Sequence, residues 1–392
     1  MIGSVFRITL FLYALFVPIL NEAGQPVSAH IVQQGIDFSF YQQTAEKLFS
    51  RPFSEITDSF KTFYDNPFEG HYDLLIAGPV VPVLIIGFEY RQGNTLPLAL
   101  FYLGLGIGLL WLWLFWLRGM GAPKILLLLF ALLPNPLWFT LNLSSDLPFA
   151  ACMVVFYLTY FDRQGENRHW IVWGIALLLL VMTRPNGLSI LLFVLIHQTI
   201  RAYQQRSIHI PAFACLSTVT LAAGIYLLPY FSAVLHALPR EHASYTYFGY
   251  STQVYFGGIF DLLPKWLDWP LSWLTLLGAK LLYFVGLRPS YGEVAWWIVT
   301  LRAGAGLILL PGLVWTAVRG DTKHRLLIGL FLLPFIGGPS QDRYNLAIQP
   351  LLFYFGYLAY RDIFTFGAFI FAPKLRQKNL KTRAETTIPS SD

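Results

Sequence analysis

The chain has 392 residues, of which 56% are hydrophobic and only 12% are charged, and its formal net charge is +6. Ordinary soluble domains carry about 25% charged residues, so this composition excludes a typical soluble enzyme. Many apolar runs approach the roughly 20 residues that an α-helix needs to cross a bilayer. Cys152 and Cys215 are the only cysteines and both lie in apolar runs, which argues against a disulfide framework or a zinc site. The sequence therefore predicts an all-α polytopic membrane protein with one transmembrane domain over residues 1–373.

The first apolar segment, residues 3–20, is not followed by a small-x-small cleavage site, so we interpret it as an uncleaved first crossing. Basic residues recur in clusters, and the positive-inside rule assigns such clusters to the cytoplasm. With both termini inside, this assignment predicts about ten crossings. They fall near residues 4–20, 95–117, 125–142, 146–161, 169–183, 186–200, 210–231, 294–318, 325–339 and 344–360.

Two external loops follow from this topology, at residues 21–94 and 232–293. Residues 21–73 contain eight acidic and three basic residues, as an external segment can. If either of the apolar runs 74–88 and 273–287 crossed the membrane, the basic clusters after it would move to the external side. We therefore interpret both runs as helices on the outer leaflet. If both cross instead, the chain has about twelve crossings. The basic, Ser/Thr-rich tail 374–392 is expected to be a disordered cytoplasmic end.

Polar and charged residues at the mouth of a membrane bundle are costly, and each is a candidate for function. On the predicted topology several of them meet at the outer face. They are Asp37 in the first loop, Asp146 in "NLSSDLPF", Arg184 and Asn186 in "TRPNG", and Asp342, Arg343 and Tyr344 in "PSQDRYNLAIQP".

Structural interpretations compete with each of these assignments. Asp37 can cap an amphipathic helix predicted over residues 38–49, and we weigh capping and function equally. For Asp146, followed by Leu-Pro, an N-cap is favoured. The Arg184 segment can be a tight turn with a snorkelling arginine, and Asp342–Arg343 can be a local ion pair, although arginine also suits bidentate phosphate binding.

Two further patterns are weaker. The Tyr-rich run 244–258 is either an interfacial aromatic belt, which we favour, or a platform for a sugar or isoprenoid. Glu69, His71 and Asp73 alternate as metal ligands can, but so short a cluster does not favour a metal. No cofactor is therefore assigned, and a divalent metal is not favoured.

Taken together, these segments resemble the GT-C glycosyltransferases, the class that contains protein O-mannosyltransferases, GPI mannosyltransferases and the aminoarabinose transferases of lipid A. The resemblance rests on the early acidic loop with Asp37 and its amphipathic helix, and on the motifs "GPVVPVLI", "SSDLP", "TRPNG" and "DRYNLAIQPLL". It covers nearly the whole chain as architecture, but its motifs are short. The paired acid of many members is absent, because Asp37 is followed by Phe38.

The resemblance implies transfer of a sugar from a polyprenyl-phosphate donor to a lipid, glycan or protein acceptor. The reaction would take place at the external face of the plasma or inner membrane, with inversion at the anomeric carbon. In this interpretation Asp37 is the general base, and Arg343, Arg184 and Tyr344 bind the donor phosphate. The remaining candidates would bind substrate: Asp146, Asn186, Tyr41, Asp342, His71 and Asp73.

Two other functions compete with this one. A polysaccharide polymerase or ligase also needs external arginines, but it usually has its large loop late in the chain. A transporter of lipid-linked saccharides predicts charges near mid-span and broken helices. Arg302 is the one candidate for such a charge, and it can equally lie at the outer end of its crossing.

Overall fold

In the computed structural model of the protein, the described residues are all-α apart from two pairs of two-residue strands. The residues that it describes are 1–16, 33–34, 38–49, 78–89, 96–133, 136, 140, 142–161, 168–184, 186–224, 246–247, 250–251, 265–287, 296–337 and 342–365.

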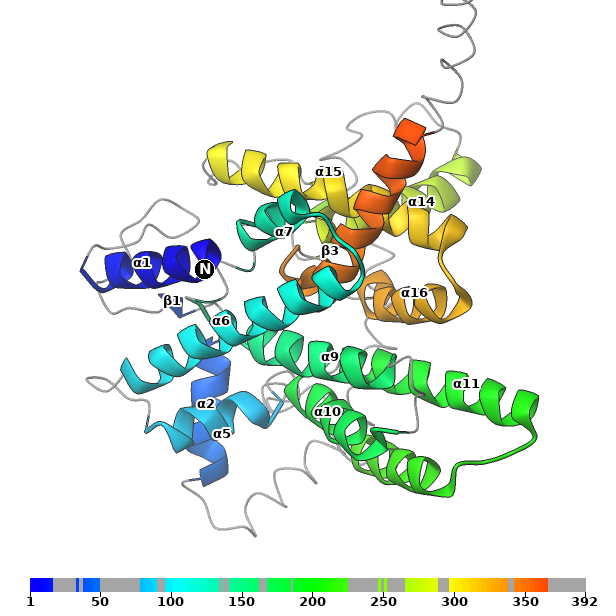
Figure 1. The fold of residues 1–392 in the computed structure, drawn as a ribbon, viewed down its shortest axis with the longest axis horizontal. Helices are drawn as coiled ribbons and strands as arrows, with labels where there is room; N and C mark the ends of the chain where they lie inside the picture. Colours follow the sequence, from blue (N-terminus) through cyan, green and yellow to red (C-terminus); the bar gives the residue numbers. More distant parts are fainter. Residues whose placement is uncertain are drawn as a thin grey trace, which may run out of the picture.

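Helix α9 (Asp146–Tyr160) lies at the centre of the bundle (Figure 1). It packs against α10 (Trp170–Thr183), α6 (Leu96–Gly119) and the 3₁₀ helix η2 (Asp342–Ala347). Its sequence, DLPFAACMVVFYLTY, is apolar on every side, as expected for a helix surrounded by protein. Because α9 is surrounded, the residues at its first turn are positioned by several elements at once.

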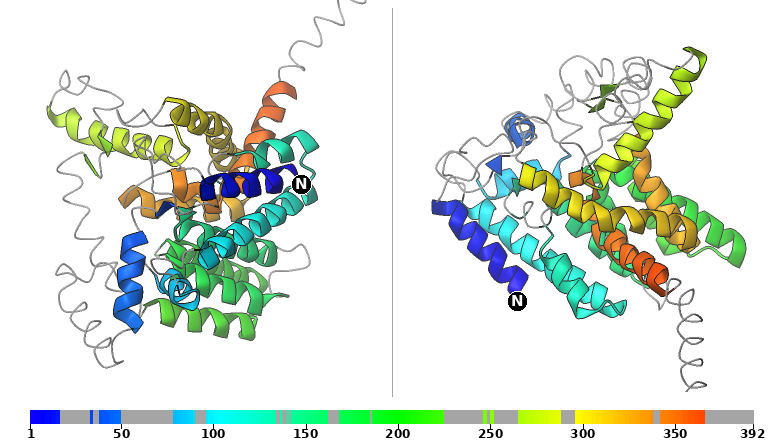
Figure 2. Two further views of the ribbon diagram at one scale, coloured as in Figure 1. Left: turned by 90° about the vertical axis from the view of Figure 1, so that its left-hand side faces the viewer. Right: turned by 90° about the horizontal axis from the view of Figure 1, so that it is seen from above.

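The N-terminal elements cover one side of this centre. Helix α1 (Ile2–Phe16) packs along α6 and touches α7 (Lys124–Ala131), while α2 (Phe38–Phe49) packs on α5 (Val80–Gly87). Figure 2 shows α2 and α5 at the same end of the molecule, apart from α15 and α16. Strand β1 (Gln33–Gln34) pairs in parallel with β2 (Asn142–Leu143), which brings the chain before α2 next to the chain before α9.

The C-terminal half contains α11 (Gly187–Gln205), α14 (Lys265–Phe284), α15 (Trp296–Arg319), α16 (Thr322–Gly337), a helix over Ile210–Gly224 and a last helix over 349–365. The strands β3 (Thr246–Tyr247) and β4 (Tyr250–Ser251) form a short antiparallel pair. Helix α15 crosses the last helix where Gly312 meets Gly356. A Cβ atom on Gly312 would lie 2.8 Å from the Gly356 nitrogen, so only small residues allow these backbones to approach.

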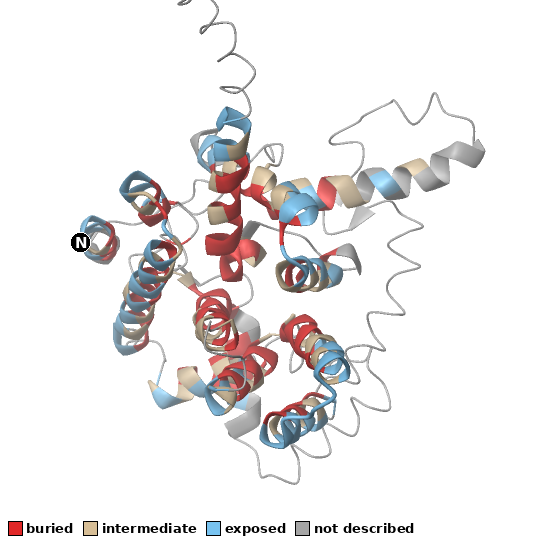
Figure 3. Cartoon of the chain, turned by 45° about the vertical axis from the view of Figure 1, so that its right-hand side comes forward, coloured by how far each residue is buried: buried red, intermediate tan, exposed pale blue. Residues whose placement is uncertain are grey.

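Two helices of the described chain, Leu96–Gly119 and Thr300–Arg319, are long and apolar enough to cross a membrane. Only 44% and 22% of their most apolar windows are buried inside the protein. In Figure 3 the buried residues gather on the inner faces of the bundle, and the exposed ones face outward. By length and composition alone, two such helices are weak grounds for membrane association.

Several predicted helices are confirmed. The amphipathic helix predicted over 38–49 matches α2. The helices predicted over 146–161 and 169–183 match α9 and α10 within one residue at each end. Those predicted over 95–117 and 294–318 match α6 and α15 within two residues at each end.

Other boundaries were wrong. The helix predicted over 125–142 ends at Ala131, because Pro134 follows and the residue before a proline avoids helical backbone angles. Residues 136 and 140 are helical again. Helix α11 continues to Gln205 rather than ending at 200, and α14 begins at Lys265 rather than 273. The predicted helix 344–360 starts as a 3₁₀ turn and becomes α-helical from residue 349.

Candidate active site

Three described segments meet at the first turn of α9. They are the turn between α10 and α11, the 3₁₀ helix η2 and helix α2. They bring together side chains that lie as far apart in sequence as Tyr41 and Tyr344. This convergence is the structural basis of the candidate site.

An ion pair forms the centre of the site. Arg184 donates from a terminal guanidinium nitrogen to Oδ1 of Asp146, and their side chains are only 12% and 3% exposed. The other carboxylate oxygen of Asp146, Oδ2, is buried and has no hydrogen-bond partner among the described residues. A buried carboxylate oxygen without a partner is costly, so this atom indicates a place where a further donor can bind.

The ring of Tyr344 lies under two guanidinium groups. The Cζ atom of Arg184 is 4.8 Å from the ring centroid, and that of Arg343 is 5.0 Å from it. Arg343 also donates to the Tyr344 hydroxyl at 3.1 Å. Tyr344 is itself stacked on Phe335 at 5.3 Å between centroids, which holds the ring in place. The aromatic face attracts both cations and fixes where their N–H groups point.

The charge of this cluster favours an anion. Among the described side chains it holds two guanidinium groups and one carboxylate, and the two guanidinium groups on one ring repel each other. A phosphate bound beside them would relieve this repulsion and could accept two-pronged hydrogen bonds from planar guanidinium donors.

Serine and tyrosine side chains fix the turn that carries Asp146. The Tyr41 hydroxyl is 2.7 Å from Ser145 Oγ, and the Tyr102 hydroxyl donates to the Ser144 carbonyl at 2.8 Å. Ser144 Oγ accepts the backbone N–H of Asp146 at 3.3 Å. All of these side chains are buried, so Asp146 is held by α2 and α6 as well as by its own helix.

The favoured interpretation of Asp146 as a helix N-cap was wrong. Helix α9 begins at Asp146 itself, the N-cap position is Ser145, and no side chain makes a capping hydrogen bond there. The carboxylate instead turns to Arg184, whose charge is a stronger partner than a backbone N–H group. The Arg184 segment does form a tight turn, in which the Gly187 N–H donates to the Arg184 carbonyl at 2.9 Å, and its arginine pairs with Asp146. Binding of a donor phosphate by Arg184 stays a prediction.

Among the residues predicted for the site, Tyr41, Asp146, Arg184, Arg343 and Tyr344 are connected as described above. Asn186 occupies the N-cap of α11, two residues from Arg184, and its carbonyl accepts the Ser189 hydroxyl at 2.6 Å. The first residue of η2 is Asp342, whose side chain lies outside the described part of the structure. Asp37, His71 and Asp73 also lie outside the described residues, as does Glu69 of the weak metal pattern.

The residues that support Asp146 were not predicted from the sequence. Ser144, Ser145 and Tyr102 carry no charge, and a hydroxyl gives little signal unless its partner is known. The motif "SSDLP" did contain both serines, so a test for local side-chain-to-backbone bonds could have found the Ser144 contact. Asn345 and Gln349 were missed too. Both are fully buried, and neither Gln349 polar atom has a partner among the described residues.

A second polar cluster lies at the far end of α9, which is about 22 Å long. The Tyr157 hydroxyl is 2.6 Å from His324 Nε2, and His324 Nδ1 is 2.7 Å from Asp321 Oδ1. The adjacent turns carry the basic residues Arg118, Arg168, Arg319 and Arg325. The Asp146–Arg184 site and the predicted cytoplasmic turns therefore lie at opposite ends of the same helix.

Gly78 positions the Arg184 turn. Its φ is +56°, and a Cβ atom there would lie 2.6 Å from the Thr183 carbonyl oxygen. We expect Gly78→Ala to strain the backbone, push away the end of α10 and lower the melting temperature. Gly87→Ala is the matched control, because a Cβ atom on Gly87 has no neighbour within 4 Å in the described structure. Equal melting temperatures for both variants would contradict this role.

Comparison with known proteins yields no match to a family model, a curated protein or a solved structure. Within the described residues, no group of three or more His, Cys, Asp and Glu side chains is arranged to hold a metal ion. The chemistry of the site therefore has to be argued from its own residues.

Proposed function

We propose that the protein is a multi-pass membrane glycosyltransferase of the GT-C kind. It transfers a sugar from a polyprenyl-phosphate donor to a lipid, glycan or protein acceptor at the external face of the membrane. The observation that carries this proposal is the cluster of Arg184, Arg343 and Tyr344 around Asp146, at the end of α9 away from the basic turns.

The membrane part of the proposal is supported by what the helices expose. On α6, large apolar side chains such as Trp111 and Phe115 are 51% and 74% exposed, and α15 exposes Leu307 and Val318 in the same way. Soluble monomers rarely expose contiguous apolar surfaces of this kind, whereas lipid covers them without cost. The shorter apolar helix α9 lies inside the bundle and would cross with it. Helix α10 packs on α9 and exposes Ile175 and Leu179 on its outer face, as a helix in contact with lipid would.

The chemistry requires a phosphate-binding group and a base. The acceptor hydroxyl attacks the anomeric carbon, a carboxylate takes its proton, and the bond between that carbon and the phosphate oxygen breaks. The polyprenyl phosphate leaves with increased negative charge, which Arg184 and Arg343 would stabilise. We assign the base to Asp37, which precedes α2, because Tyr41 of α2 contacts Ser145 beside Asp146.

Asp146 has a different role in this proposal. Its Oδ1 accepts from Arg184 and so orients the guanidinium plane, while Oδ2 is available to accept a hydroxyl of the sugar. Tyr41, Asn186 and Asp342 complete the substrate-binding set at the same end, and His71 and Asp73 in the first external loop are proposed to contact the acceptor.

Turnover is the direct test of this function. The purified protein is given a panel of polyprenyl-phosphate sugars with an extract of membrane acceptors, and release of polyprenyl phosphate is measured. We expect release with at least one donor and loss of release when Arg343 is replaced by glutamine. Movement of intact donor across vesicles without any release would contradict the proposal and favour a transporter.

The proposed orientation makes a separate prediction. In a variant without Cys152 and Cys215, a cysteine introduced at position 60 should react with a membrane-impermeant thiol reagent in intact cells. A cysteine at position 380 should react only after the membrane is opened, because the basic clusters are expected inside. The reverse pattern would contradict both the topology and the external site.

A further inference from the structure

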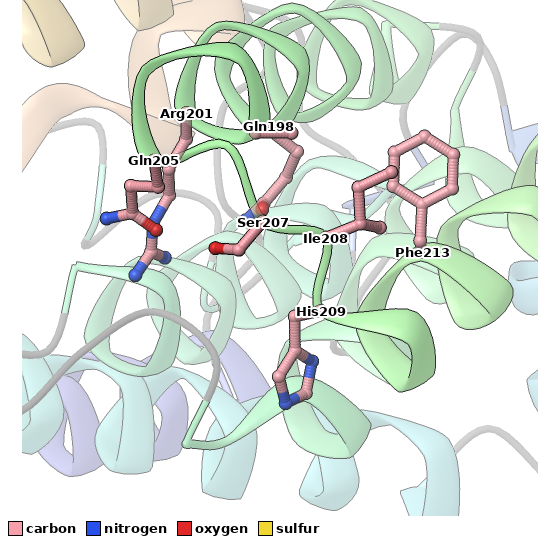
Figure 4. Close-up of a pocket in the computed structure, with 8 residues that line it drawn as sticks. Gln198, Arg201, Gln205, Ser207, Ile208, His209 and Phe213 are labelled. Atoms are coloured by element: carbon pink, nitrogen blue, oxygen red, sulfur yellow. The ribbon is translucent and has the colours of Figure 1, made fainter.

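A cavity of about 190 Å³ lies where α11 ends and the helix Ile210–Gly224 begins, in the region of the basic turns. Figure 4 shows the side chains of Arg201, Gln205 and Ser207 on one side of it, and those of Ile208 and Phe213 on the other. Water occupies about 30 Å³ per molecule in the liquid, so the cavity has room for a group the size of a phosphate. The cavity is thus polar on one side and apolar on the other.

The polar side is built from oriented hydrogen-bond donors. Nε of Arg201 donates to Gln205 Oε1 at 3.2 Å, which fixes the plane of the guanidinium group. His209 Nδ1 accepts the backbone N–H of Ala212 at 3.2 Å, so the proton of a neutral His209 ring resides on Nε2, which is then a donor. Gln198 is 8% exposed and is anchored by its bond to the Tyr160 hydroxyl at 3.2 Å.

No acidic side chain lines this cavity among the described residues. No Asp or Glu occurs between residues 167 and 240, whereas Arg201 and Arg206 lie within this turn. The helix Ile210–Gly224 begins directly after His209, and the positive end of its dipole adds to the same field. Arg201, Arg206 and this helix end therefore attract an anion toward the cavity.

We propose that this cavity binds the phosphate group of an anionic phospholipid from the leaflet at the basic end of the bundle. Arg201, Ser207 and His209 would donate to the phosphate oxygens. Ile208 and Phe213, which are 61% and 41% exposed, would contact the acyl chains. This lipid site is separate from the glycosyl-transfer site, and it uses the proposed orientation but not the proposed reaction.

Binding of a fluorescent phosphatidylglycerol to the purified full chain in detergent micelles tests this inference, with phosphatidylcholine as the neutral counterpart. We expect saturable binding that prefers phosphatidylglycerol. Arg201→Gln should weaken it about tenfold, the effect of losing one charge-assisted hydrogen bond. Arg206→Gln is the matched control, because it removes the same charge from the same turn but Arg206 does not line the cavity.

Equal losses for both variants would mean that general surface charge attracts the lipid, and would overturn the site. Equal affinity for the two lipids would overturn it as well. Inorganic phosphate is the third ligand, and if it displaces phosphatidylglycerol at equal concentration, the free ion is the ligand and the lipid assignment is wrong. Arg201→Lys serves as a second variant with unchanged charge, and melting temperatures verify that each variant is folded.

Discussion

Replacing Asp37 with asparagine is expected to abolish sugar transfer while donor binding stays near that of the wild type. Asparagine caps a helix almost as well as aspartate, so α2 should still form. It cannot accept a proton, and loss of a general base typically lowers the rate by about 10²–10⁴-fold. Turnover, donor affinity and melting temperature are measured together, so that a folding defect is distinguished from a catalytic one.

The matched control for Asp37→Asn is Glu46→Gln, which removes a carboxylate from the exposed face of the same helix. It should leave turnover unchanged. If Asp37→Asn is as active as the wild type, Asp37 only caps α2 and the base is another carboxylate. Asp37→Ala should then show lower stability and normal turnover per folded molecule.

Asp146→Asn gives a different expected result, which separates the two carboxylates. Asp146 holds Arg184 through an ion pair, and Asp146→Asn removes this ion pair. The Arg184 guanidinium group should then lose its fixed position, and both donor binding and turnover should weaken. A defect confined to turnover, with normal donor affinity, would identify Asp146 rather than Asp37 as the base.

The second large effect is expected from Arg184→Lys and Arg343→Lys. Lysine keeps the charge but loses the planar, two-pronged donor that suits a phosphate. Removing one donor that stabilises a developing anion typically costs about 10²–10³-fold in rate. We expect each variant to lose turnover on this scale, with a smaller loss of donor affinity, because the leaving phosphate carries more charge in the transition state than in the bound donor.

Arg118→Lys is the control for these variants, since Arg118 is exposed at the end of α6 and lies at the opposite end of the bundle. Turnover like that of the wild type in both Arg184→Lys and Arg343→Lys would show that these arginines serve the fold alone. A melting temperature reduced in parallel with activity would lead to the same conclusion.

Sequence patterns predicted the helices where the local signal was strong. The period of α2 and the apolar lengths of α9 and α10 depend on neighbouring residues only, and the structure has these helices at the predicted positions. The prediction of one helix over 125–142 failed because apolar character continues past Ala131 while Pro134 interrupts the helix.

The site was only partly predictable for a related reason. Asp146, Arg184 and Arg343 could be selected as candidates because charged residues are rare in so apolar a chain. The predicted topology placed all three at the external face of the membrane. Which atoms meet depends on tertiary packing, so the Asp146–Arg184 pair and the placement of both arginines on Tyr344 could not be derived from spacing. The hydroxyl supports from Tyr41 and Tyr102 join segments that are 104 and 42 residues apart, and local patterns carry no information over such separations.

The most direct test of the central claim is a comparison of polyprenyl phosphate with the matching polyprenol, which has the same tail and no phosphate. Equilibrium binding of both is measured to the wild type and to the double variant Arg184→Gln/Arg343→Gln. We expect the wild type to bind the phosphate form at least about tenfold more tightly, as charge-assisted hydrogen bonds would give, and the double variant to lose this preference. Equal binding of the two lipids by the wild type, or an unchanged preference in the double variant, would contradict the central claim.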